Sequence, residues 1–147
     1  MRRFAFRLER LLELRAHRER EALYRLAEAT GRCVRLTRSI QELAGRRGEA
    51  FRSVPAAGGS LDLGLFAYRE RYLAWLEATR RRLTEELARR EKERLEVQQK
   101  YLEASRKRKV LDKLKERRAA EHYREQRAEE FKVQDDVAAG QFVRGRE

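Results

Sequence analysis

One segment decides the fold: Ser53-Val54-Pro55-Ala56-Ala57-Gly58-Gly59-Ser60. It holds the only proline and the only adjacent pair of glycines among the 147 residues. Proline and glycine favour turns and disfavour the interior of helices. On either side, from about Phe4 to Ala50 and from about Asp62 to Ala138, the composition is typical of helices. The sequence therefore predicts two helices joined by a loop at about residues 51–61.

Both helical stretches carry a seam in which residues recur at steps of three and four. This spacing places one stripe of each helix against a partner helix, as in a coiled coil. The first series is Leu8, Leu12, Arg15, Glu19, Ala22, Leu26, Ala29, Cys33, Leu36, Ile40 and Leu43. The second series is Tyr72, Leu76, Thr79, Leu83, Leu87, Arg90, Arg94, Val97, Tyr101, Ala104, Arg108 and Leu111. The predicted fold is all-α, a two-helix antiparallel coiled-coil hairpin that forms a single domain over residues 1–147.

The predicted register leaves the second helix longer than the first at the end that carries both termini. If the turn is centred near residue 57, Phe4 lies beside Val110, and the apolar seam fades after Leu114. About 24 residues up to Ala138, or roughly 36 Å of helix, would then be unpaired, followed by a frayed tail at residues 139–147. Basic residues outnumber acidic ones between Glu103 and Arg124, so we expect the overhang to be basic.

The bulk composition limits the classes of function. The charged fraction is 42% and the net charge is +12, while the mean hydropathy is −0.91, so apolar residues suffice for a narrow seam and not for a large globular core. The positive charge predicts attraction to polyanions and acidic protein surfaces. The single cysteine, Cys33, excludes an intrachain disulfide and is expected to be a small seam residue in a reducing cytosol. We expect neither a signal peptide nor a membrane-spanning helix.

The sequence lacks the groupings of residues that catalysis needs. His17 and His122 stand far apart, and no second type of metal ligand clusters near either. Gly58-Gly59 is too short for a loop that binds phosphate, and no nucleophile has a base beside it. The expectation is a protein without enzymatic activity, metal or cofactor.

Two features could instead contact a macromolecule. The run Arg106-Lys107-Arg108-Lys109 is either a solvated helix face, a surface for an acidic protein groove, or a contact for nucleic acid. Nucleic acid is disfavoured, because the basic region of a leucine zipper precedes its zipper, and few leucines follow this run. A second feature is a group of aromatic residues near the loop, which either pack the tip of the hairpin or dock a protein: Phe51, Phe66, Tyr68, Tyr72 and Trp75.

Both ends of the chain carry a distinctive pattern of apolar and charged residues. At the N-terminus the pattern is Phe4-x-Phe6-x-Leu8-x-x-Leu11-Leu12-x-Leu14-Arg15. Near the C-terminus it is Arg106-Lys107-x-Lys109-x-Leu111-x-Lys113-Leu114-Lys115-Glu116-Arg117, followed by Tyr123, Glu129-Glu130 and Asp135-Asp136-Val137-Ala138. Together these patterns resemble the flagellar export protein FliJ family. The resemblance extends over nearly the whole chain, and it includes the length and the helical hairpin.

The resemblance implies a cytoplasmic stalk of the flagellar type III export apparatus, peripheral to the inner face of the cell membrane. Proteins of that family are similar to the coiled coil of the rotary ATPase γ subunit; they insert their termini end into the hexameric export ATPase FliI, and they contact the export gate protein FlhA and export chaperones. Carried over by position, the residues facing the ATPase ring would be Phe4, Phe6, Leu8, Leu11, Leu12, Arg106, Lys107, Lys109, Lys113, Leu114, Arg117 and Tyr123. Those facing the gate would be Phe66, Tyr72 and Leu76. A coiled coil that binds nucleic acid and the stalk of a virulence secretion system are the alternatives.

Overall fold

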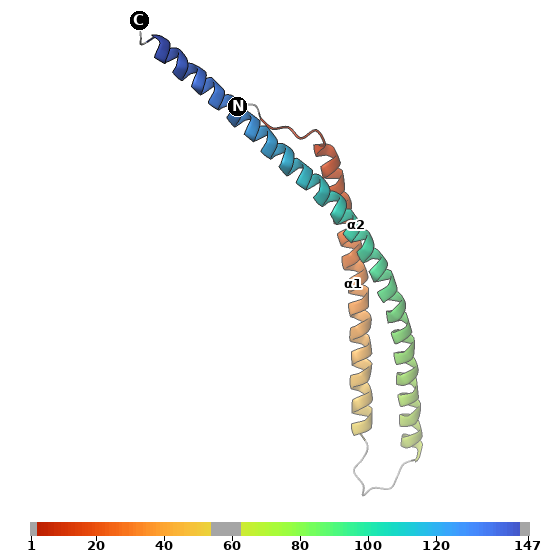
Figure 1. Ribbon diagram of the computed structural model, residues 1–147. Coiled ribbons are helices and arrows are strands. Elements are labelled where there is room, and N and C mark those ends of the chain that lie inside the picture. The colour runs from red at the N-terminus through yellow and green to blue at the C-terminus, as the bar shows by residue number, and fades with distance from the viewer. Residues whose placement is uncertain (1–2, 54–62, 145–147) are drawn as a thin grey trace. The chain divides into compact units, whose positions relative to one another are not determined.

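The computed structural model describes residues 3–53 and 63–144 and consists of two helices, α1 (Glu9–Arg52) and α2 (Leu63–Arg144). The helices pack on each other as an antiparallel hairpin in which α2 is the longer (Figure 1). The described residues contain no strand. The predicted all-α hairpin is therefore confirmed. Most of the expected loop lies outside the described residues.

The chain divides into two compact units. Unit 1 comprises residues 1–20 and 102–147, and unit 2 comprises residues 21–101. Each unit contains a length of α1 packed on a length of α2. The expectation of a single domain stays a prediction.

The two predicted seams are the buried faces of the helices. Every member of the second series is at least partly buried, and so is every member of the first except Leu8. Leu12, Cys33, Leu43 and Leu76 are the buried apolar side chains. Spacing of three and four residues thus identifies the contact face correctly in both helices.

The register of the pairing differs from the expected one. In unit 1 the ring of Phe4 lies 5.7 Å from that of His122, centroid to centroid, whereas we expected Phe4 beside Val110. Lys115 Nζ lies 2.8 Å from Glu9 Oε1. The helices are therefore offset by about twelve residues, or three turns, from the expected register. The estimate from a turn centred near residue 57 takes no account of which side chains meet across the two helices, and the observed offset brings an acidic side chain of α1 opposite a basic side chain of α2.

Residues 3–8, called here the N-terminal segment, are not helical. We expected the helix to begin near Phe4, but it begins at Glu9, whose backbone N–H donates to the Phe6 carbonyl over 3.1 Å. An acidic residue in the first turn is favourable beside the positive end of the helix dipole. The segment contacts α2 through the partly buried Phe4 ring, Phe6 is also partly buried, and Leu8, just outside the helix, is exposed.

The last turns of α2, residues 127–144, form what we call the C-terminal overhang. Every side chain from Arg127 to Gln141 is exposed, and α2 continues to Arg144 where we expected an end near Ala138. The expected basic character is wrong, because the basic segment between Glu103 and Arg124 pairs along one face with α1 and the N-terminal segment and is therefore not part of the overhang. The overhang itself has three basic residues, Arg127, Lys132 and Arg144, and four acidic ones, Glu129, Glu130, Asp135 and Asp136.

Neither helix has, among its described residues, an apolar stretch long enough to cross a membrane.

Candidate interaction surfaces

A polar cluster interrupts the seam of unit 1. Glu19 of α1 accepts a hydrogen bond from the Arg108 guanidinium of α2, which also bonds to Asp112. Burial by itself would raise the pKa of Glu19, but hydrogen bonds from Arg108 and Ser105 and the charges of Arg108 and Lys109 lower it below its usual value. Ser105 is itself buried. The cluster joins the two helices, so Arg108 is occupied within the chain and is not free to bind a partner.

The other cations of this region form a stripe on the outer face of α2. Residues three, four and seven apart share one face of a helix, and the basic residues at this spacing are Arg106, Lys109, Lys113, Arg117 and Arg124. Each lies about half a turn from the buried series, and all five are exposed. None of them makes an ion pair with another residue in the described part of the chain. We call this row the basic stripe; it includes four of the five cations expected to face the ATPase, and the fifth, Lys107, is exposed at its border.

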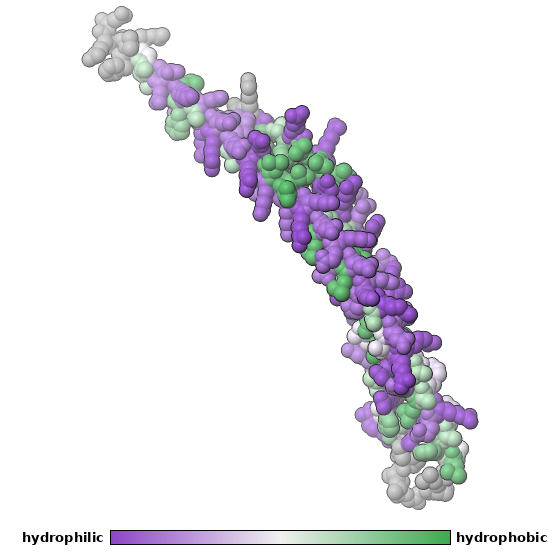
Figure 2. All heavy atoms as spheres, turned by 45° about the vertical axis from the view of Figure 1, so that its right-hand side comes forward, coloured by the Kyte–Doolittle hydropathy of each residue, from purple (hydrophilic) through white to green (hydrophobic). Residues whose placement is uncertain are grey.

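The apolar residues expected at the same end divide into exposed and covered groups. Leu8, Leu11 and Tyr123 are exposed, whereas Leu12 is buried and Leu114 is partly buried in the seam. Figure 2 shows a mainly hydrophilic surface on which hydrophobic atoms gather near the start of α1. Unit 1 thus combines a small apolar patch with the basic stripe.

At the other end of the chain, unit 2 carries a groove between α1 and α2. Its volume is about 350 Å³, and it is lined by Leu43, Ala44, Arg47, Gly48, Phe51, Leu76, Glu77 and Arg80. Ala44 and Gly48 are small, which keeps the groove open on the α1 side. The floor is apolar and the rim is charged.

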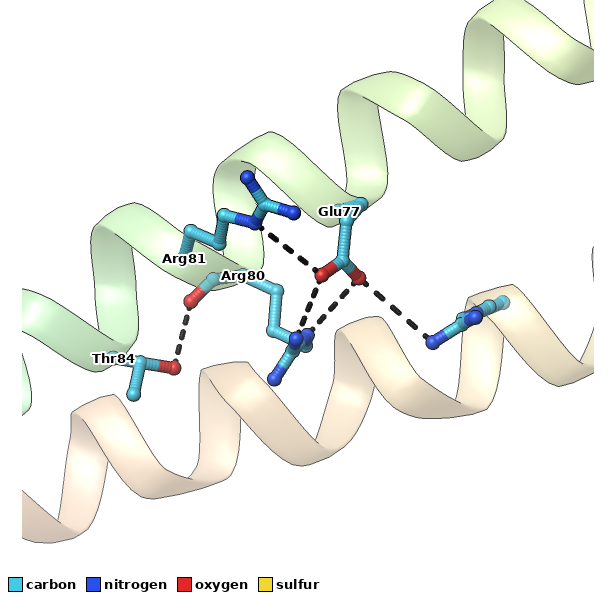
Figure 3. A network of polar contacts seen from close by, with 5 residues as sticks. Glu77, Arg80, Arg81 and Thr84 are labelled. Carbon is cyan, nitrogen blue, oxygen red and sulfur yellow. Dashed lines mark hydrogen bonds and ion pairs between the residues drawn. The ribbon is translucent and has the colours of Figure 1, made fainter.

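Glu77 is the centre of a charge network at the rim of this groove (Figure 3). Its carboxylate accepts hydrogen bonds from Arg80 at 2.7 and 3.1 Å, and it lies 3.6 Å from Arg81 Nε and 3.8 Å from Arg47 Nη1. The hydrogen bond from Arg80 is the main reason that the pKa of Glu77 is lowered. One carboxylate therefore faces three guanidinium groups, which leaves the rim with an excess of positive charge.

The residues expected to face the gate differ in accessibility. Phe66 is exposed beneath the guanidinium of Arg69, 5.2 Å from its ring centroid. Tyr72 is partly buried and stacks against Trp75. Leu76, at 2% exposure, is the most buried large side chain described, so it supports the floor of the groove and does not project from it.

Four of the five aromatic side chains near the loop are exposed, namely Phe51, Phe66, Tyr68 and Trp75. Of the two uses expected for this group, packing of the hairpin tip and docking of a protein, the exposed rings leave the second open. The α1 side of the groove, with Arg47 over the Phe51 ring at 5.6 Å, was not predicted. The sequence does contain one indication of this contact, because residues four apart, such as Arg47 and Phe51, lie next to each other on one face of a helix.

The described residues contain no group of three or more metal-binding side chains. The His122 ring packs between Phe4 and Tyr123, and His17 is exposed on α1. Neither histidine is therefore part of such a group within the described residues.

Comparison with known proteins identifies one family. No curated protein and no solved structure matches the chain. A family model described as Flagellar FliJ protein matches residues 4–147. That match extends over residues of both compact units and includes both of the sequence patterns at the two ends of the chain. The chain therefore belongs to the flagellar FliJ protein family.

Proposed function

We propose that this chain is the stalk that couples the export ATPase to the export gate. Membership of the family makes it a component of flagellar type III protein export, and the family is non-catalytic. In the proposal, unit 1 enters the ring of a hexameric FliI-like ATPase, and unit 2 contacts a FlhA-like gate protein at the membrane. Export chaperones are further proposed partners.

The observation that carries the proposal for the ATPase is the basic stripe. Its five cations are exposed on one face, and they make no ion pair with the described residues. Lys109 adds only a longer-range attraction to Glu19. Cations that are not engaged within the chain can pair with carboxylates on a ring of subunits without first breaking a contact, so the attraction is available at no internal cost.

The test is the effect of the full-length chain on the purified ATPase. We expect the chain to increase both the hydrolysis rate and the oligomerisation of the ATPase at low salt. The triple variant Arg106→Glu, Lys109→Glu, Lys113→Glu should require about tenfold more protein for half-maximal stimulation, a loss of ~1.4 kcal/mol. Rising salt should reduce the difference, because it screens exposed charges.

The matched control changes the same total charge in unit 2. Arg25, Arg35 and Arg38 are exposed residues of α1, and reversing all three to glutamate should leave the stimulation close to that of the unaltered chain. Equal losses in the two triple variants would attribute the effect to net charge alone. A wild-type chain that leaves the ATPase unchanged at low salt would overturn the stalk proposal.

For the gate, we propose the groove of unit 2 together with the exposed Phe66 and the partly buried Tyr72. An apolar floor beneath a rim rich in arginine suits an apolar anchor flanked by carboxylates. Leu76 contributes by packing beneath this surface. Phe66→Ala should weaken binding to the cytosolic domain of the gate protein about five- to thirtyfold, as for an aromatic anchor worth about 1–2 kcal/mol.

The control for Phe66 is Tyr24→Ala, which removes an exposed aromatic ring from α1 in the same unit. Calorimetric titration of both variants with the gate domain measures the two affinities. If both variants bind like the wild type, the gate does not use this aromatic surface.

A further inference from the structure

The C-terminal overhang continues the seam of unit 1 past the last residue that covers it. Steps of three and four from the partly buried His122 and Gln126 lead to Glu129, Val133, Val137 and Gly140 on the same face of α2. Val133 is 62% exposed and Val137 is 55% exposed. Within the described residues, nothing packs on them. The seam therefore contains apolar positions that lack a facing helix.

A helix of this length is marginal in water when no packing supports it. The overhang has 18 residues, about 27 Å, and its side chains up to Gln141 are exposed. Glycine at position 140 lowers helix propensity further. A facing helix that buried the two valines would provide the packing that the rest of α2 receives from α1.

The charges beside the valines determine which helix fits. Glu129 lies on the seam itself, Asp136 lies along one border beside Lys132, and Glu130 lies along the other border, so three carboxylates and one ammonium surround the valines. Flanking positions of opposite charge select the partner in a coiled coil. A facing helix with lysine or arginine at its borders is therefore complementary, and one with glutamate is not.

We propose that the C-terminal overhang docks a basic amphipathic helix of a partner protein, which extends the seam through Val133 and Val137. This partner has the opposite charge from the one that the basic stripe attracts, so unit 1 carries two surfaces for two different partners. A second copy of the overhang is a poor occupant, because it would place acidic borders against acidic borders.

The test uses the full-length chain and two synthetic helical peptides. Both peptides carry leucine and isoleucine at steps of three and four; one has lysine at every flanking position and the other has glutamate. We expect the lysine peptide to bind and to slow amide hydrogen exchange in residues 127–144 about tenfold or more. The glutamate peptide should give no protection there.

Adjacent residues supply matched variants. Asp136 borders the valines, whereas Asp135 lies on the opposite face of α2. Asp136→Lys should therefore weaken binding of the lysine peptide about three- to tenfold, and Asp135→Lys should weaken it less than about twofold.

A second pair of variants tests the apolar positions. The double variant Val133→Ser, Val137→Ser should lower the affinity for the lysine peptide about tenfold or more, while Phe131→Ser on the opposite face should change it little. Because the altered residues are exposed, the variants should keep the fold of the wild-type chain. Fluorescence anisotropy of a labelled peptide then measures each affinity.

Four results would overturn the proposal. The two peptides could bind equally, or the substitutions at Asp135 and Asp136 could have equal effects on the affinity. The protection from hydrogen exchange could lie outside residues 127–144. Finally, the chain could associate with itself in a way that the valine variants abolish. The last result would assign the overhang to a second copy of this chain. None of these outcomes depends on whether the chain stimulates an ATPase.

Discussion

Leu76→Ala is expected to lower the free energy of unfolding by about 2–5 kcal/mol, the usual range for a leucine truncated in a packed core. Leu76 is the most buried large side chain described, at 2% exposure, and it forms the floor between α1 and α2 in unit 2. A two-helix hairpin has few neighbouring side chains that could move in to fill the space. The truncation therefore removes apolar burial and leaves the two helices imperfectly packed.

The measurement is urea-induced unfolding followed by the circular dichroism of the helices. Leu95→Ala is the matched control, since Leu95 lies on the same helix in the same unit and is 51% exposed. Its effect should stay within about 0.5 kcal/mol. A similar loss for both substitutions would mean that helix propensity and not core packing sets the stability of the hairpin.

The second large effect is expected from Glu19→Ala, with a loss of about 1.5–3 kcal/mol. Glu19 and Arg108 join the helices of unit 1 inside the seam. Removing the carboxylate takes the Glu19 acceptor from the buried Ser105 hydroxyl and leaves the partly buried Arg108 guanidinium with Asp112 alone, on its own helix. Arg108→Ala should be costly for the reciprocal reason, and the double variant should lose less than the two single losses added together.

The effect of Glu19→Ala should depend on pH. Because the folded chain holds the pKa of Glu19 below its usual value of 4.5, the contribution of this group to stability is present above that value. It is lost as the pH falls below about 4.5 and through the lower pKa of the folded state. Unfolding curves of wild type and variant should therefore converge in acid. A difference that stays constant from neutral pH into this acidic range would show that the charge of Glu19 does not stabilise the pairing.

The burial pattern of the helices was predictable, and their register was not. The steps of three and four identified the buried face because periodicity depends only on the order of residues along one helix. Register depends on which residues of two distant segments meet. Here it is associated with a few cross-helix charge pairs, such as Glu9 with Lys115 and Arg47 with Glu77. A turn assumed to be centred near residue 57 does not take these pairs into account, so it could not give the correct register.

The same distinction applies to the interaction surfaces. The exposure of Arg106, Lys109 and Lys113 follows from their place opposite the seam, so the sequence could indicate them as free cations. Arg108 differs from these cations because it lies on the seam, where it pairs with Glu19 of α1. By contrast, the acidic character of the unpaired end of α2 depends on how far the N-terminal segment reaches along that helix. It could be recognised only once Phe4 was placed against His122.

The division between engaged and unengaged cations has a consequence for the thermodynamics of binding. Arginines of unit 2 such as Arg80, Arg90 and Arg94 already neutralise glutamates three residues away on α2, so few small anions need to condense around them. The basic stripe instead holds mobile counterions that an acidic partner displaces. The slope of log affinity against log salt concentration should accordingly be proportional to the number of cations in the stripe. It should not reflect all 37 lysines and arginines of the chain.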